Sequence, residues 1–87
     1  MSSTHGKFDT RDSCTISYTL HPHANINAPR IALVHSLALD RTIWDGVVTE
    51  LAPHAAILAY DCRGHGASSP VVMRYTAAQF ADDLAQL

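Results

Sequence analysis

The pattern of apolar and polar positions along the chain predicts strands that alternate with helices. Every second position from residue 13 to residue 20 is apolar: Cys14, Ile16, Tyr18 and Leu20. This period of two is typical of a strand with one buried and one exposed face. Residues 31–34 and 55–60 are instead continuously apolar, which is typical of strands buried on both faces of a sheet. The sequence therefore predicts three strands, with residues 31–34 in a central position.

Apolar residues at helical spacing predict one helix between the two buried strands and a second helix near the end of the sequence. In the first helix these residues are Ile43, Trp44, Val47, Val48 and Leu51. Either Asp40 or Thr42 can cap its start, and Pro53 ends it. Thr76 and Gln79 have the spacing of a capping box, which opens the second helix. Its apolar stripe consists of Phe80, Leu84 and Leu87.

The strand, helix and strand over residues 31–60 predict one βαβ unit with a right-handed crossover. Residues 13–87 are thus expected to form part of a single α/β domain. Residues 1–12 are polar and lack periodicity, so we expect a disordered or variable extension there.

Composition excludes several classes of function. The 87 residues carry a formal net charge of -2 without a block of like charges, so nothing recruits nucleic acid or an anionic membrane. No apolar run approaches the roughly 18 residues of a membrane span, and no hydrophobic signal core precedes the fold, so the expected location is the cytoplasm. Two distant cysteines are expected to be reduced, and six scattered histidines predict no metal site.

Candidate chemistry follows the two buried strands, because ligands of open α/β sheets collect beyond the carboxyl ends of strands. Gly64-His65-Gly66 resembles the start of a dinucleotide fingerprint, but Ser69 replaces the third glycine and the helix begins too late. Ser68 lies too deep in a loop to be a nucleophile on a strand-to-helix elbow. Ser36 next to His35 is also disfavoured as a nucleophile, because neighbouring side chains at a strand end point to opposite faces.

Taken in order, three motifs resemble the N-terminal part of the α/β-hydrolase fold. They are His35-Ser36-Leu37 after one strand, Trp44-Asp45 on the helix, and Asp61-x-Arg-Gly-His-Gly-x-Ser68 after the next strand. The likeness extends over nearly all of residues 16–87. Within the superfamily the sequence looks most like 3-oxoadipate enol-lactonases and their esterase relatives, in which a Ser-Leu pair often stands in the oxyanion turn.

The resemblance implies a role for each of these positions. Leu37 matches the residue whose backbone N–H is one oxyanion-hole donor, and such a donor can be worth about 10² to 10³ in rate. His35 and Ser36 match residues that shape this turn, although many relatives have glycine in place of Ser36. A further group is expected to brace the adjacent loop: Asp61, Arg63, Gly64, His65 and Gly66.

By the same resemblance, the whole protein is a serine hydrolase of a small ester or enol-lactone that needs no cofactor or metal. The nucleophile, acid and base of such an enzyme are expected after Leu87, so the 87 residues alone should be inactive. They would need the rest of the domain, in cis or from a second chain.

Two alternatives remain open. One is another activity of the same fold, such as a C–C hydrolase, a perhydrolase or a dehalogenase. The other is a short non-catalytic chain that pairs with a partner through the open edge of the strand at residues 31–34.

Overall fold

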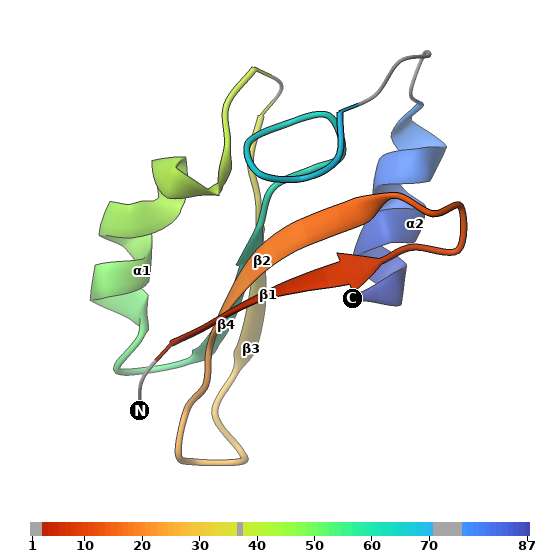
Figure 1. Ribbon diagram of the computed structural model, residues 1–87. Coiled ribbons are helices and arrows are strands. Elements are labelled where there is room, and N and C mark those ends of the chain that lie inside the picture. Colours follow the sequence, from red (N-terminus) through yellow and green to blue (C-terminus); the bar gives the residue numbers. More distant parts are fainter. Residues whose placement is uncertain (1–2, 37, 71–75) are drawn as a thin grey trace.

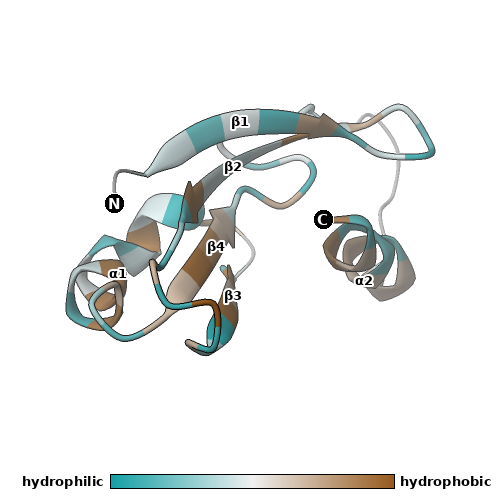
Figure 2. Ribbon diagram, turned by 90° about the horizontal axis from the view of Figure 1, so that it is seen from below, coloured by the Kyte–Doolittle hydropathy of each residue, from teal (hydrophilic) through white to brown (hydrophobic). Residues whose placement is uncertain are grey.

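The computed structural model describes residues 3–36, 38–70 and 76–87, and in this part of the chain it contains a four-stranded sheet with helices on both faces (Figures 1 and 2). The strands are β1 (Thr4–Asp9), β2 (Thr15–His21), β3 (Arg30–Val34) and β4 (Ala56–Tyr60), in the order β1-β2-β4-β3. β1 is antiparallel to β2, and β2 is antiparallel to β4, whereas β3 and β4 are parallel.

A helix connects the two parallel strands, which confirms the predicted βαβ unit. It begins with a 3₁₀ turn, η1 (Arg41–Trp44), and continues as α1 (Asp45–Leu51). Asp40 is the cap, because its side chain accepts the backbone N–H of Thr42. The apolar face of this helix lies against β3 and β4, where it buries Leu33, Ala55, Ile57 and Ala59.

The second helix, α2 (Ala77–Gln86), lies on the opposite side of the sheet from α1 (Figure 2). The predicted capping box is present, with reciprocal hydrogen bonds between Thr76 and Gln79. Phe80 and Leu87 pack against a second core cluster, which consists of Ile16, Tyr60 and Cys62. Leu84 is instead 38% exposed, so the predicted apolar stripe is only partly correct.

The expectation of a disordered extension over residues 1–12 is wrong for β1, which pairs with β2 from Thr4 to Asp9. Apolar periodicity gave no signal there, because β1 is held by backbone pairing and most of its side chains stay exposed. Its hairpin to β2 is closed by the backbone N–H of Thr10, which donates to the carbonyl of Cys14 at 2.8 Å. The Thr10 hydroxyl accepts the backbone N–H of Cys14 in return.

The alternating strand also differs from its prediction. Ser17 and Thr19, on the face of β2 predicted to be exposed, are only 5% and 6% exposed. Arg41 donates to the hydroxyl of Ser17, and His5 of β1 bonds the hydroxyl of Thr19. The polar face of β2 is therefore covered by polar partners.

β3 lies at an edge of the sheet in the described part of the chain, and β4 is the inner strand. The predicted central place of residues 31–34 depends on a further strand that was expected outside these 87 residues. Beside the edge, an open groove of about 560 Å³ is lined mainly by apolar side chains, among them Leu20, Pro22, Ile26, Ala32 and Leu58. None of the helices described is long and apolar enough to cross a membrane.

Candidate functional site

The turn after β3 occupies the position where the sequence predicted function. The backbone N–H of Leu39 donates to the carbonyl of Ser36 at 3.2 Å and closes the turn. Ala38 has φ of 67°, in the left-handed region that costs a residue with a Cβ roughly 1–2 kcal/mol. Leu37, the predicted oxyanion donor, lies outside the described residues.

His35 joins the ends of β3 and β4. Its Nε2 accepts the backbone N–H of Cys62 at 2.9 Å, so Nδ1 carries the proton and donates to the carbonyl of Ser36 at 2.8 Å. The ring is buried. His35 thus shapes the turn from inside the sheet, with both ring nitrogens bonded to backbone groups.

His65 holds the same turn from the neighbouring loop. Its Nε2 accepts the backbone N–H of Ala38 at 3.0 Å, and its Nδ1 donates to the carbonyl of Arg63 at 3.0 Å. The centroids of the His35 and His65 rings are 5.0 Å apart. Two buried imidazoles, each with its proton on Nδ1, therefore lie side by side behind the turn.

Asp61 organises the loop that follows β4. Its carboxylate accepts the backbone N–H and the guanidinium of Arg41, both at 2.7 Å, and the backbone N–H of Ala67 at 3.0 Å. Gly66 has φ of 49°, and a Cβ placed there would lie 2.4 Å from the Asp61 carboxyl carbon. Glycine is therefore required at this position. Arg41 was not predicted as a site residue, because its partner Asp61 lies 20 residues away along the chain.

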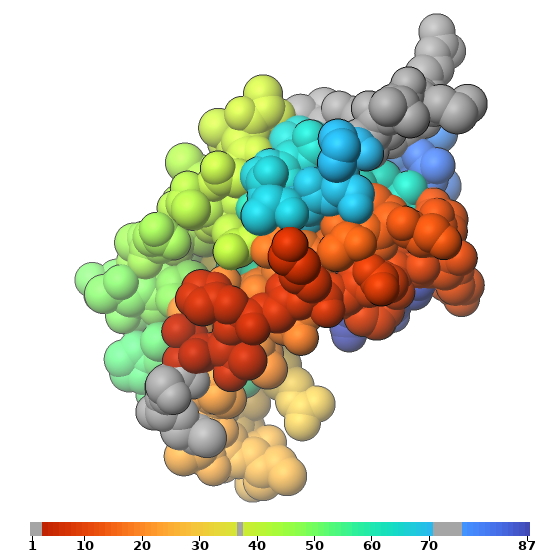
Figure 3. Space-filling model, in the orientation of Figure 1, coloured from red at the N-terminus to blue at the C-terminus, as the bar shows by residue number. Residues whose placement is uncertain are grey.

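The hydroxyl of Ser68 is used for structure. It donates to the carbonyl of Asp61 at 2.5 Å and accepts the backbone N–H of Ser17 at 2.9 Å. The neighbouring Ser69 accepts the backbone N–H of Thr15. Figure 3 shows the loop wedged between the N-terminal hairpin and the turn after β3.

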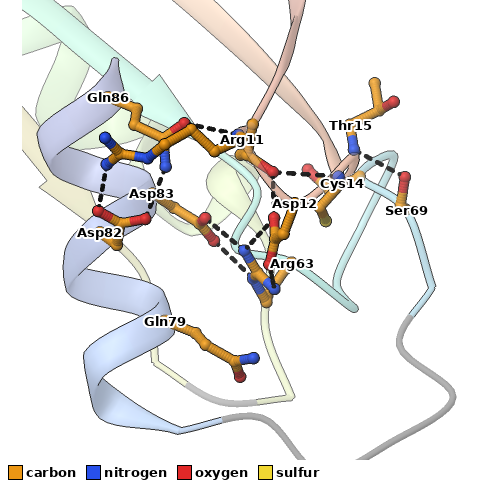
Figure 4. Close-up of polar contacts among 12 residues, drawn as sticks. Arg11, Asp12, Cys14, Thr15, Arg63, Ser69, Gln79, Asp82, Asp83 and Gln86 are labelled. Atoms are coloured by element: carbon orange, nitrogen blue, oxygen red, sulfur yellow. Dashed lines mark hydrogen bonds and ion pairs between the residues drawn. The ribbon is translucent and has the colours of Figure 1, made fainter.

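Arg63 extends this bracing to α2 (Figure 4). Its guanidinium forms two hydrogen bonds with the buried carboxylate of Asp83, at 2.8 and 2.6 Å, and two more with Asp12 in the hairpin. The bond from Arg63, with a second from Thr10, lowers the pKa of Asp12 to about 2. Both carboxylates raise the pKa of Arg63 in turn.

Neither acidic partner of Arg63 was predicted, but one signal was available. Asp83 is three residues after Phe80 and four before Leu87, so it lies on the buried face of α2. A carboxylate on the apolar face of a helix predicts a cationic partner, because burying an unpaired charge costs folding free energy. Asp61 bonds the backbone of the loop, and His35 and His65 bond backbone groups of the turn, whereas the side chain of Arg63 bonds α2 and the hairpin. The bracing role expected of these positions stays a prediction.

Metal and thiol chemistry find no support in the described residues. No group of three or more histidine, cysteine, aspartate or glutamate side chains in those ranges could hold a metal ion. Burial raises the pKa of the Cys62 thiol, as it does for Cys14, so both favour the protonated form. Burial likewise raises the pKa of Tyr60 to about 12.

Solved structures share this fold over almost the whole chain. A hydrolase from Pseudomonas aeruginosa PA01 matches 94% of it with a TM-score of 0.84 and 32% identity. An enol-lactonase from Burkholderia xenovorans LB400 matches 92% with a TM-score of 0.83 and 31% identity. The chain folds as the N-terminal part of an α/β-hydrolase. It spans 30% of each of those two solved chains.

Sequence comparison finds a curated relative of another description. The probable oxidoreductase EphD of Mycobacterium tuberculosis is 39% identical over 77 residues, which are 86% of this chain and 13% of the relative. No family model matches the sequence. The structural neighbours thus support an α/β-hydrolase segment, but they do not single out the enol-lactonase group.

Proposed function

We propose that this chain supplies the oxyanion turn, with its supporting loop, to a serine hydrolase that acts on a small ester or an enol-lactone. The supporting observation is the doubly held turn at the carboxyl end of β3, where His35 bonds Ser36 and His65 bonds Ala38. A turn fixed before the reaction loses little energy to reorganisation when negative charge develops on a substrate oxygen. The backbone N–H of Leu37 is the proposed donor.

The chemistry would require partners from outside this segment. A serine attacks the acyl carbon, a histidine accepts its proton and then protonates the leaving oxygen, and an acid orients the histidine. We assign none of these roles to this chain, because the hydroxyls of Ser68 and Ser69 bond backbone groups. The proposed substrate class follows the resemblance to enol-lactonases and the enol-lactonase among the structural neighbours.

The curated relative is named as a probable oxidoreductase, but nicotinamide binding has less support in this chain than the hydrolase proposal. A dinucleotide fingerprint works because its glycines open directly onto the N-terminus of a helix that faces the pyrophosphate. Here Gly64 and Gly66 precede the loop through Ser68, and α2 begins only at Ala77. Gly66 instead makes room for the Asp61 carboxylate.

The test is reconstitution with a complementary polypeptide. The chain would be co-expressed with the remaining segment of the Burkholderia enol-lactonase, and the purified complex would be assayed with p-nitrophenyl acetate and with an enol-lactone. We expect hydrolysis of both, and its loss when the nucleophilic serine of the complementary segment is changed to alanine. A stable complex no more active than this alanine control would overturn the proposal. The intact mass of the protein purified from its source would show whether such a segment is joined in cis.

A second candidate function follows from the open edge of β3. Beside it lies the apolar groove, so a partner strand could gain backbone hydrogen bonds and bury apolar surface together. In this alternative the chain is a non-catalytic binding module. Sedimentation equilibrium separates the two candidates, because a stable, soluble monomer without a partner would argue against strand addition.

A further inference from the structure

We infer that His65 is a positioning residue for the oxyanion turn and that it holds the turn only while its imidazole is neutral. This inference rests on the proposed function, because it concerns the same turn. It goes further by assigning the turn a specific acceptor atom, Nε2 of His65, and an acid-sensitive state.

The hydrogen-bond directions define the protonation state. A backbone N–H can only donate, so Nε2 of His65 must accept from Ala38, just as Nε2 of His35 accepts from Cys62. Each Nδ1 faces a carbonyl and therefore carries the proton. A protonated imidazole has no acceptor, so protonation of His65 would set two N–H groups against each other at Ala38.

The position of this bond matters because the turn is strained. Ala38 has φ of 67°, a left-handed conformation that is strained for a residue with a Cβ. The surrounding contacts must therefore hold this conformation. Among the described residues, two hydrogen bonds contribute to this: the backbone N–H of Leu39 donates to the carbonyl of Ser36, and the backbone N–H of Ala38 donates to His65. Loss of the bond between Ala38 and His65 would remove a contact that holds the strained residue itself.

The segments that bond or adjoin the two rings, among the described residues, are residues 38–41 and the loop after β4. Their titratable and charged groups are Asp40, Arg41, Asp61, Cys62 and Arg63. Hydrogen bonds from Thr42 lower the pKa of the Asp40 carboxyl, and its interaction with His35 acts in the same direction. Asp61 and Arg41 form an ion pair with each other, and the Arg63 guanidinium is occupied by carboxylates. At 5.0 Å, a cation on either ring opposes a second one.

The test follows the turn by NMR and needs no catalysis. In the full chain with ¹⁵N-labelled histidine, we expect the neutral form of both rings to carry the proton on Nδ1. Once the ¹⁵N shifts report a protonated His65, the protection of the Ala38 amide against hydrogen exchange, corrected for intrinsic exchange, should have fallen about five- to tenfold, which corresponds to one lost hydrogen bond.

A conservative variant separates positioning from general packing. In His65→Gln the amide oxygen can accept from Ala38 without titrating, so protection of that amide should no longer change with pH. The exposed His54→Gln is the matched control and should titrate like the unmodified chain. A neutral His65 with its proton on Nε2, or Ala38 protection that is constant throughout the titration, would overturn the inference even if the glutamine variant did not fold. Failure of the hydrolase proposal would leave these NMR results unchanged.

Discussion

The two ends of the sheet are built by different means. At the carboxyl ends of β3 and β4, buried polar side chains bond backbone groups and one another. The loop after β4 lies against the segment that follows β3 on the surface there (Figure 3). At the amino ends of the same strands, an apolar groove opens beside an edge that no described strand covers. Polar networks specify one geometry because an unpaired buried group is costly, whereas apolar surface accepts any complementary partner. Among the described residues, the buried polar groups of the first end bond partners within the chain, whereas the apolar edge of the second end is left uncovered.

The largest effect should come from breaking the ion pair under the polar end. Asp83→Ala leaves the buried guanidinium of Arg63 without its main partner, so we expect a loss of about 3–5 kcal/mol in the free energy of unfolding. Asp82→Ala, one position earlier on α2, removes an exposed ion pair with Arg11 and should cost less than about 1 kcal/mol. Urea unfolding followed by circular dichroism measures both. Equal losses would mean that the buried pair does not stabilise this end.

A methyl group at Gly66 should have the next largest effect. Gly66→Ala places a Cβ against the Asp61 carboxyl group at a left-handed backbone position, so about 2–4 kcal/mol should be lost. Gly46→Ala is the matched control, because a Cβ there meets nothing within 4 Å and α1 should gain about 1 kcal/mol. Thermal unfolding of the two variants would show shifts of opposite sign. A neutral Gly66 variant would show that the Asp61 contacts can move without cost.

Acid should weaken the polar end in a defined range. The pKa of Asp12 is about 2 in the folded chain, below its ordinary value of 3.8, so its bond to Arg63 stabilises the fold above the ordinary value. That contribution is lost as the pH falls through about 2, and Asp12→Asn should lack this part of the pH dependence. Urea unfolding at pH 2 to 5 measures it, with the exposed Glu50→Gln as the control. Parallel pH curves for Asp12→Asn and the unmodified chain would contradict the assignment.

The smallest effect on folding is expected at the open edge of β3. Val34, at the end of β3, is 43% exposed, so Val34→Lys should change the free energy of unfolding by no more than about 0.5 kcal/mol. It should nevertheless weaken self-association, because a charged side chain on an edge strand opposes pairing. Sedimentation equilibrium at several concentrations measures both chains. Equal association constants would mean that β3 is not the surface through which copies associate.

The sequence by itself determined the elements whose pattern is local. Continuous apolar runs predicted the two parallel strands, helical spacing predicted α1, and the Thr76–Gln79 capping box predicted the start of α2. Each of these signals lies within a single strand or helix, so it can be read without knowing the tertiary contacts. His35, Asp61, Arg63 and His65 could be singled out because they follow directly after predicted strands, whereas Arg41, Asp12 and Asp83, which bond them, could not.

Only the tertiary structure decided the contacts between distant segments. Arg63 meets Asp12 across 51 residues and Asp83 across 20, and no local periodicity encodes such a pairing. β1 was missed because backbone pairing with β2, rather than apolar burial, orders it. The turn after β3 depends in the same way on His65, 27 residues beyond Ala38. Local patterns fix which segments become strands and helices, whereas the geometry of the site depends on which buried polar groups find a partner after those segments have packed.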